Sequence, residues 1–287
     1  MDRQGESTRV ERGMADFQTL HYEVVNPGDE GIARVTLDRP ESRNAQNKRM
    51  TYEMNDCFDD AVRRTDVKVI VLDANGPHFC SGHDMRDRES FEDFTRLQPT
   101  LPMSAPGQEG QMAFEEEVYM GMCWRWRNLP KPVIAAAQGK TIAGGLPLLW
   151  IADVIVASDD ALFSDPTVGF GVNGVEYFAH PWELGARKAK EMLFTGDWVS
   201  ASEAHALGMI NHVVPRDSLH EFTLALAARI AKRPAFALKL AKESVNQTLE
   251  TQGQYSAMRA AFMVQQLAHA NNRAKYGIPV EPPPAAK

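Results

Sequence analysis

Cysteine is scarce in this chain. Its 287 residues include only three cysteines, Cys57, Cys80 and Cys123. An odd number without a C-x-x-C spacing argues against a disulfide framework and against a cysteine-based zinc site. Such cysteine usage suits a reducing compartment, so we expect a cytoplasmic protein.

Long hydrophobic runs and a leader are also missing. The most apolar stretch, residues 141–157, is shorter than the ~20 residues that span a bilayer, and glycine, proline and aspartate interrupt it. It predicts a buried helix followed by a strand. The first residues are polar and charged, without the apolar segment of a signal peptide. We therefore expect no membrane association.

Basic residues are fewer than acidic ones. The chain has 31 Lys and Arg against 38 Asp and Glu, which gives a formal net charge of −7. Without a dense basic face, nucleic acid is not an expected partner. An anionic small ligand held at a local site remains open.

Several catalytic signatures are absent. None of the eight histidines forms the i, i+4 pair with a carboxylate that zinc enzymes use, so no metal site is predicted. The chain has no G-x-S-x-G nucleophile elbow and no phosphate-cradling P-loop. The segment 169–174 matches G-x-G-x-x-G formally, but Pro166 precedes it and Pro181 soon follows. We favour a glycine-rich turn beside a ligand or another backbone over a dinucleotide site.

The abundant residues fit a soluble globular protein. Hydrophobic residues make up 44% and charged residues 24% of the chain, enough for one large domain or two smaller ones. Strand patterns, beginning with a hairpin, occur at Leu20–Val25, Ile32–Leu37, 68–73, Val133–Ala137, 153–157 and 210–214. Helical patterns occur at 50–65, at 113–128, after Gly144 and from a Ser200 capping box to Gly208. Three more occur over 217–274, broken at Arg233-Pro234 and near Gln252-Gly253. This order predicts an α/β core with a C-terminal helical layer.

Two glycine loops follow predicted buried strands, at 77–85 and 138–145. Glycine lets a ligand approach the main chain, so that free N–H groups can point into a cleft. Two such loops that meet in space can offer two N–H donors to one carbonyl oxygen. Each donor of such an oxyanion hole can be worth ~3 kcal/mol. A pair of ordinary strand–helix turns is the alternative.

In this order and spacing, the two loops resemble those of the enoyl-CoA hydratase/isomerase, or crotonase, superfamily. Further blocks resemble it as well: Leu37-Asp-Arg-Pro40, KPVIAAAQG, LFTGD at 193–197 and AHALGMINHVV at 204–214. The resemblance implies an α/β, crotonase-like spiral of ββα units over 17–215 and a C-terminal helical trimerisation region over 216–276. A flexible tail at 1–16 and a Pro-rich tail at 277–287 would flank them.

The resemblance also implies a ligand and an assembly. The ligand would be an acyl-CoA thioester, with no separate cofactor because CoA is part of the substrate, and the protein would be a homotrimer or a dimer of trimers. By family position, the oxyanion donors would be the N–H groups of His83 and Gly144. The CoA wall would hold five residues: Glu41, Ser42, Arg43, Ser81 and Met85. The two donors would stabilise a thioester enolate, which hydration, isomerisation and several cleavages share.

Two positions depart from the family. Its hydratases carry glutamates where this chain has Pro147 and Thr167. Neither residue is an acid or a base at neutral pH, so an ordinary hydration lacks both of its groups. The candidate catalytic substitutes are Asp165, Glu176 in an expected helix after Gly174, and the side chain of His83.

Three functions are therefore open. The first is a lyase of the enoyl-CoA hydratase/isomerase family, and the second is an isomerase or C–C bond hydrolase that uses Asp165 or Glu176. The third is a non-catalytic acyl-CoA-binding protein. Residues 98–108 form either a lid or a plain mobile loop. Trp124 and Trp126 either line an acyl pocket or pack in the core.

Overall fold

The computed structural model describes residues 10–12, 17–90, 94, 96–97 and 102–282. Parts of both predicted tails, and residues 98–101 of the segment interpreted as a lid or a plain loop, therefore lie outside the described residues. Among the described residues, no helix is long and apolar enough to cross a bilayer.

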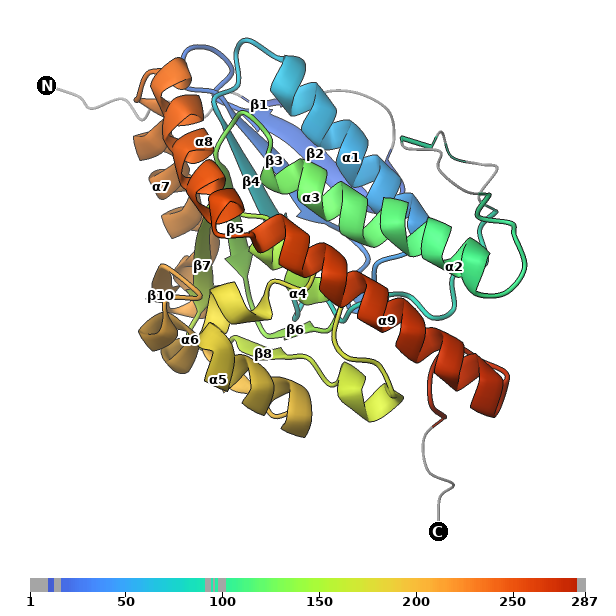
Figure 1. Cartoon of the computed structure of the whole chain (residues 1–287). Coiled ribbons are helices and arrows are strands. Elements are labelled where there is room, and N and C mark those ends of the chain that lie inside the picture. The colour runs from blue at the N-terminus through green and yellow to red at the C-terminus, as the bar shows by residue number, and fades with distance from the viewer. Residues whose placement is uncertain (1–9, 13–16, 91–93, 95, 98–101, 283–287) are drawn as a thin grey trace, which may run out of the picture.

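A large twisted sheet forms the centre of the protein (Figure 1). Its strand order is β1 (Val10–Arg12), β2 (Leu20–Val25), β3 (Ile32–Leu37), β4 (Val69–Ala74), β5 (Val133–Ala137), β7 (Val154–Ser158) and β10 (His212–Val214). The predicted hairpin of β2 and β3 is confirmed, with Leu20 opposite Leu37. The strands from β3 to β10 are parallel. β1 lies within the predicted N-terminal tail and pairs with β2, which the sequence did not indicate.

A second, smaller sheet was not predicted. It consists of β6 (Lys140–Ile142), β8 (Leu162–Ser164) and β9 (Val199–Ser200). Strands of two or three residues are too short to show the alternation of apolar and polar residues, so the sequence pattern does not predict them. The chain passes from β5 into β6 through Gly139, whose φ is +56°. A Cβ at this glycine would lie 2.1 Å from the Pro77 carbonyl oxygen, so the close approach of the two loops requires glycine here.

Helices cover both faces of the large sheet. Helix α1 (Lys48–Arg63) and the long helix that comprises α2 (Gln108–Glu115) and α3 (Met122–Arg127) cover one face, and α7 (Leu219–Ala231) covers the other (Figure 1). Alternate residues of β4 serve the two sides: Ile70 and Leu72 join the main core, while Val69 and Val71 pack in the layer of α7. Burial of β4 on both faces explains its continuous apolar sequence.

Three helices lie around the small sheet, and the start and stop signals predicted for one of them are present. The helices are α4 (Gly145–Trp150), α5 (His180–Thr195) and α6 (Ala201–Leu207). The Ser200 hydroxyl accepts a hydrogen bond from the Glu203 N–H at 3.2 Å, and Gly208 ends α6 with φ +83°. The predicted N-cap and stop of α6 are thus confirmed, whereas the helix expected after Gly174 begins only at His180, as α5.

The predicted helical end is also confirmed. After α7 come α8 (Ala235–Thr251) and α9 (Gln254–Tyr276), separated where Pro234 and Gly253 were expected to break the pattern. Helix α9, red in Figure 1, runs alongside α2 and α3. Its inward face is mostly polar: Gln254, Gln265, Gln266, His269 and Asn272 are buried beside the apolar Met258 and Phe262. The polar part of this face contacts the segment before α5, because Gln265 donates to the Gly174 carbonyl and Asn272 donates to the Gly171 carbonyl.

Candidate active site

The two glycine loops meet. The Ile142 N–H donates to the Cys80 carbonyl at 3.0 Å, which holds the second loop against the first. A Cβ at Gly82 would lie 3.4 Å from the nitrogen of Gly144. Within the described residues, neither the His83 N–H nor the Gly144 N–H has an acceptor. Two backbone donors are thus left unpaired on neighbouring loops, as an oxyanion hole requires.

The His83 side chain points into this region. A Cβ at Gly144 would lie 2.3 Å from both Cδ2 and Nε2 of His83, so the imidazole rests directly on the glycine. The other side of the imidazole stacks on Tyr119, with 3.6 Å between ring centroids and 6° between planes. The ring is therefore enclosed by the second loop on one side and by the long helix on the other.

Glu176 faces the edge of the same imidazole. Its Oε2 lies 3.6 Å from His83 Nε2 and has no hydrogen-bond partner among the described residues. The helix expected at Glu176 is wrong, because α5 begins only at His180 and Glu176 lies in an irregular segment before it. Gly174 in that segment has φ +147°, a conformation incompatible with a right-handed helix.

Burial sets the protonation of this pair. Burial raises the pKa of Glu176 well above its usual range, and the charge of Glu115 adds to the effect. Burial lowers the pKa of His83 to about 3, although Asp165 acts in the opposite direction. At neutral pH the imidazole is therefore uncharged, and the raised pKa of Glu176 favours the protonated carboxyl. Their contact is not an ion pair, and at 3.6 Å it is too long for a hydrogen bond.

Asp165 is close to this cluster, but its oxygens are occupied. The carboxylate accepts from the N–H and hydroxyl of Thr167, from the Val175 N–H at 3.3 Å, and from His180 Nε2 at 2.8 Å. Burial alone would raise the pKa of Asp165, but the hydrogen bonds from His180 and Thr167 outweigh it and lower that pKa. Asp165 thus binds both ends of the loop that leads to Glu176.

The two positions that depart from the family have structural partners. Thr167 donates its hydroxyl hydrogen to Asp165 at 2.6 Å. Pro147 is buried in the first turn of α4, where a missing N–H leaves no intrahelical hydrogen bond unmade. Neither residue supplies an acid or a base.

Three of the predicted CoA-wall residues are adjacent. Ser81 donates its N–H to the Arg43 carbonyl at 3.0 Å and its hydroxyl hydrogen to the Ser42 carbonyl at 3.4 Å. A cavity of about 240 Å³ lies here, lined by Arg43, His78, Ser81, Lys140 and Ile142. Glu41 and Met85 are exposed and do not line it.

The cavity is basic although the chain is acidic. Arg43 and Lys140 form no ion pair with any described acidic residue, and Lys140 lies 5.0 Å from the Trp198 ring centroid. Burial, with the charges of Lys140 and Arg43, lowers the pKa of His78. Lys140 was not predicted, although it lies in the second glycine loop, where a lysine beside glycines could have indicated an anion.

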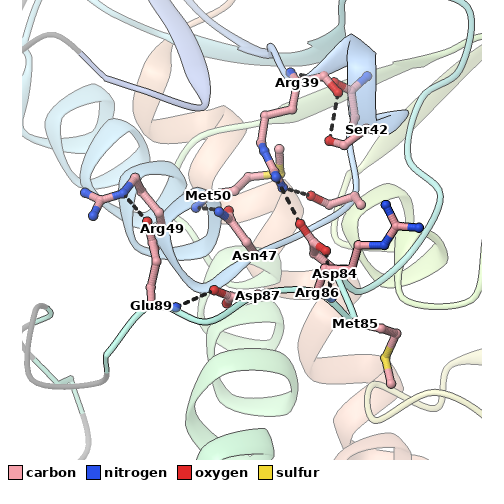
Figure 2. A network of polar contacts seen from close by, with 12 residues as sticks. Arg39, Ser42, Asn47, Arg49, Met50, Asp84, Met85, Arg86, Asp87 and Glu89 are labelled. Carbon is pink, nitrogen blue, oxygen red and sulfur yellow. Dashed lines mark hydrogen bonds and ion pairs between the residues drawn. The ribbon is translucent and has the colours of Figure 1, made fainter.

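Ion pairs fix the chain that follows His83. Figure 2 shows Arg39 reaching Asp84 and Arg49 reaching Glu89, at 2.9 Å and 2.7 Å. The Asp84 N–H in turn donates to the Gln46 carbonyl at 2.8 Å. The backbone on the C-terminal side of His83 is thus held in place, and with it the direction of the His83 N–H.

Of the two tryptophans, one packs in the core and the other lines a cavity. Trp126 is fully buried and packs edge-on against Phe58 in the core. Trp124 packs on Tyr255 and lines a larger cavity of about 550 Å³ between α3 and α8. None of the predicted catalytic or CoA-binding residues lines that cavity. In the described part of the chain, no three His, Cys, Asp or Glu side chains gather as metal ligands.

The segment 169–174 forms the predicted glycine-rich turn. A Cβ at Gly171 would lie 2.9 Å from the Asn272 side chain, and one at Gly174 would lie 2.5 Å from the Phe178 ring. The Glu281 N–H, in the C-terminal tail, donates to the Phe170 carbonyl at 2.8 Å. Gly171 thus admits close neighbours from α9 and the tail, and Gly174 admits the Phe178 ring.

Comparison with known proteins gives consistent relatives. Residues 28–279 match the family model described as "Enoyl-CoA hydratase/isomerase". EchA13 of Mycobacterium tuberculosis, whose name assigns enoyl-CoA hydratase activity provisionally, is 42% identical over 94% of this chain and 86% of its own length. The 1,2-epoxyphenylacetyl-CoA isomerase of Escherichia coli is 31% identical over 83% of this chain and 87% of its own. The crystal structure of a probable enoyl-CoA hydratase from Mycobacterium smegmatis superposes with a TM-score of 0.83 and 45% identity, over 92% of this chain and 98% of that one.

Proposed function

The chain belongs to the enoyl-CoA hydratase/isomerase family, and we propose that it binds an acyl-CoA thioester and stabilises the enolate of that thioester. One observation carries the proposal. The unpaired N–H groups of His83 and Gly144 lie beside a buried carboxyl, Glu176, whose Oε2 is also unpaired. Donors for an enolate oxygen and a group for its proton therefore occur together.

The two N–H groups would receive the thioester oxygen. As a proton leaves the α-carbon, its bonding electrons move to the carbonyl oxygen and form an enolate. Backbone donors held by the ion pairs of the His83 loop need no reorganisation when that charge appears. The proposal assigns no role in the proton transfer to Asp165, because four donors already occupy its oxygens.

Glu176 is the proposed proton carrier. In its carboxylate form, Glu176 takes the α-proton and becomes a carboxyl. The carboxyl then returns that proton to the γ-carbon while the enolate electrons restore the thioester carbonyl. The double bond has moved from the β,γ to the α,β position, and no atom has been gained or lost.

This chemistry favours isomerisation over hydration. Hydration needs one group to activate water and a second to manage protons, and Pro147 and Thr167 supply neither. The Escherichia coli relative is named for the isomerisation of an epoxide CoA thioester, a reaction of the same general class but not a double-bond shift. Hydration of an enoyl-CoA is the second candidate, favoured by the names of the mycobacterial relatives.

The basic cavity is the proposed site for the phosphates of CoA. Arg43 and Lys140 offer positive charge without competing acids, and Ser42 and Ser81 form the adjacent wall. An acidic chain can bind a polyanionic ligand in this way, because the attraction is local.

A homo-oligomer in the cytoplasm completes the proposal. Helix α8 has no buried residue, and it exposes Phe236, Leu240 and Val245. Apolar groups gathered on one helix indicate an interface, which we assign to a trimer or a dimer of trimers. The three free thiols, all buried, suit a reducing compartment. Sedimentation of the purified chain tests the assembly, and a monomer at micromolar concentration would contradict it.

Exchange of α-protons with solvent deuterium tests the chemistry directly. Butyryl-CoA has acidic α-protons but no double bond to move, so its exchange reports enolate formation alone. We expect the wild-type protein to catalyse exchange and Glu176→Gln to lower the rate by ~100-fold or more. Glu183→Gln is the matched control: burial raises the pKa of Glu183 to about 8, yet this residue has no contact with His83.

Two further substrates separate the reactions. A 3-enoyl-CoA reports isomerisation, and crotonyl-CoA reports hydration. Exchange with isomerisation but little hydration is the expected result. Tight binding of butyryl-CoA without exchange, isomerisation or hydration would identify a binding protein and overturn the proposed function.

A further inference from the structure

One turn of the long helix beside the site is π-helical. Residues Glu116–Gly121 join α2 to α3, and the N–H of Met122 returns to the carbonyl of Glu117, five residues earlier. A π turn inserts one extra residue and changes the face that the following side chains present. Such turns occur frequently at functional sites. Tyr119 lies within this turn.

The ring of Tyr119, and not its hydroxyl, makes the contacts. The ring lies parallel to the His83 imidazole at 3.6 Å, and the Phe114 ring packs edge-on against it at 5.1 Å. At 3.6 Å the two stacked rings overlap more fully than in the usual offset pair. No described residue forms a hydrogen bond with the Tyr119 hydroxyl. A phenyl ring could therefore make the same contact.

The imidazole is confined on three sides. Tyr119 covers one side, the backbone of Gly144 lies against the other, and Glu176 faces the ring edge at Nε2. Removal of the Tyr119 ring would leave the first side open and allow His83 to turn about its side-chain bonds. The distance from His83 Nε2 to Glu176 Oε2 would then no longer be fixed.

We propose that Tyr119 is a positioning residue, whose ring holds the His83 imidazole flat on Gly144 with Nε2 directed at Glu176. This inference rests on the proposed function, in which the His83 N–H binds the thioester oxygen and Glu176, beside the His83 ring, carries the proton. Tyr119 touches neither the thioester oxygen donors nor the proton carrier itself. It acts through the orientation of His83, and misplacement by ~1 Å can cost ~100-fold in rate.

Three variants test this role. Tyr119→Leu removes the stacking ring, Tyr119→Phe restores it without the hydroxyl, and Tyr255→Leu is the matched control. Tyr255 is a partly exposed tyrosine that packs on Trp124 at 4.5 Å and not on His83. Two kinds of measurement are made: the kinetics of α-proton exchange of butyryl-CoA, as kcat and KM, and the NMR shifts of the His83 ring protons. A stacked tyrosine moves these proton signals upfield through its ring current.

The expected pattern is specific. Tyr119→Leu lowers kcat by about 10- to 100-fold with KM changed by less than about threefold, and it removes the upfield shift of the His83 signals. Tyr119→Phe recovers most of kcat and the shift, and Tyr255→Leu resembles the wild type. An unchanged kcat in Tyr119→Leu overturns the inference. So does an equal loss in Tyr119→Phe, which would indicate a role for the hydroxyl.

The two proposals fail in different ways. If the wild-type protein exchanges no α-protons, the proposed function fails. The His83 signals then decide the positioning role alone: the same shifts in the wild type and in Tyr119→Leu refute it, and a shift lost only in Tyr119→Leu supports it.

Discussion

His180 Nε2 lies 2.8 Å from Asp165 Oδ2, and both side chains are completely buried. Asp165 follows β8, and His180 opens α5, so the contact closes the irregular segment that carries Glu176. Donation from Thr167 and Val175 fixes two further points of that segment. The position of the Glu176 carboxyl thus depends on a residue that we do not place in the chemistry.

Replacement of Asp165 should cost stability. In Asp165→Asn an amide takes the place of one carboxylate oxygen, and its NH₂ group faces donors. Loss of one partner of a buried charged network typically lowers the free energy of unfolding by about 3–5 kcal/mol. Urea unfolding measures the change, and Asp159→Asn, at an exposed aspartate, should be neutral. An equal change in both variants would show that the network contributes nothing.

The pH dependence of the free energy of unfolding should reveal the raised pKa of Glu176. Its pKa is raised in the folded state, so the folded chain retains a proton that the unfolded chain releases above a pH of about 4. The stabilisation by the protonated form is complete below that pH and is lost as the pH rises through the folded pKa. Glu176→Gln resembles the protonated form and should escape this loss.

Wild type and Glu176→Gln are therefore compared by unfolding at several pH values. They should be equally stable near pH 4, and the Gln variant should become progressively more stable than wild type towards pH 8. A more stable variant that no longer exchanges α-protons would show the trade-off between stability and activity that is expected at an active site. A constant difference at every pH would mean that Glu176 titrates normally.

Gly144 should tolerate no side chain. The Cβ of Gly144→Ala would lie 2.3 Å from the His83 ring, so the imidazole must leave its place between Gly144 and Tyr119. We expect exchange of butyryl-CoA α-protons to fall by ~100-fold and the unfolding free energy by about 1–3 kcal/mol. Gly169→Ala is the control, because a Cβ there meets nothing within 4 Å. Full activity in Gly144→Ala would refute the claim that the His83 imidazole is confined between Gly144 and Tyr119.

Local pattern was sufficient for most of the fold. The hairpin of β2 and β3 and the helix breaks at Pro234 and Gly253 follow from turn and breaker residues that act within a few positions. The strands β6, β8 and β9 were not predicted. They are strands because they pair with distant segments, and their own two or three residues carry no strand pattern.

The site was predictable only in part. The glycines of the loops of His83 and Gly144 make these loops recognisable in the sequence. The resemblance to the crotonase superfamily then assigns the backbone N–H donors. The contact of Glu176 with His83 joins segments far apart in the chain, and nothing local to either residue encodes it. Tyr119 gave no signal either, because a π turn has no sequence period that marks it within a longer helix.

The basic cavity yields the last prediction, which concerns affinity and not rate. Lys140→Ala should weaken CoA binding about tenfold, since a charge-assisted contact is worth about 1.5–3 kcal/mol. Calorimetry at increasing salt should show a weaker salt dependence for the variant than for wild type, because screening acts on the charge that was removed. Lys239→Ala, in the larger cavity, is the matched control and should bind CoA normally. A thioester of pantetheine, which lacks the nucleotide phosphates, should bind Lys140→Ala and wild type equally. If Lys140→Ala weakens both ligands alike, Lys140 supports the loop and not the phosphates, and the cavity lined by Arg43 loses its assignment.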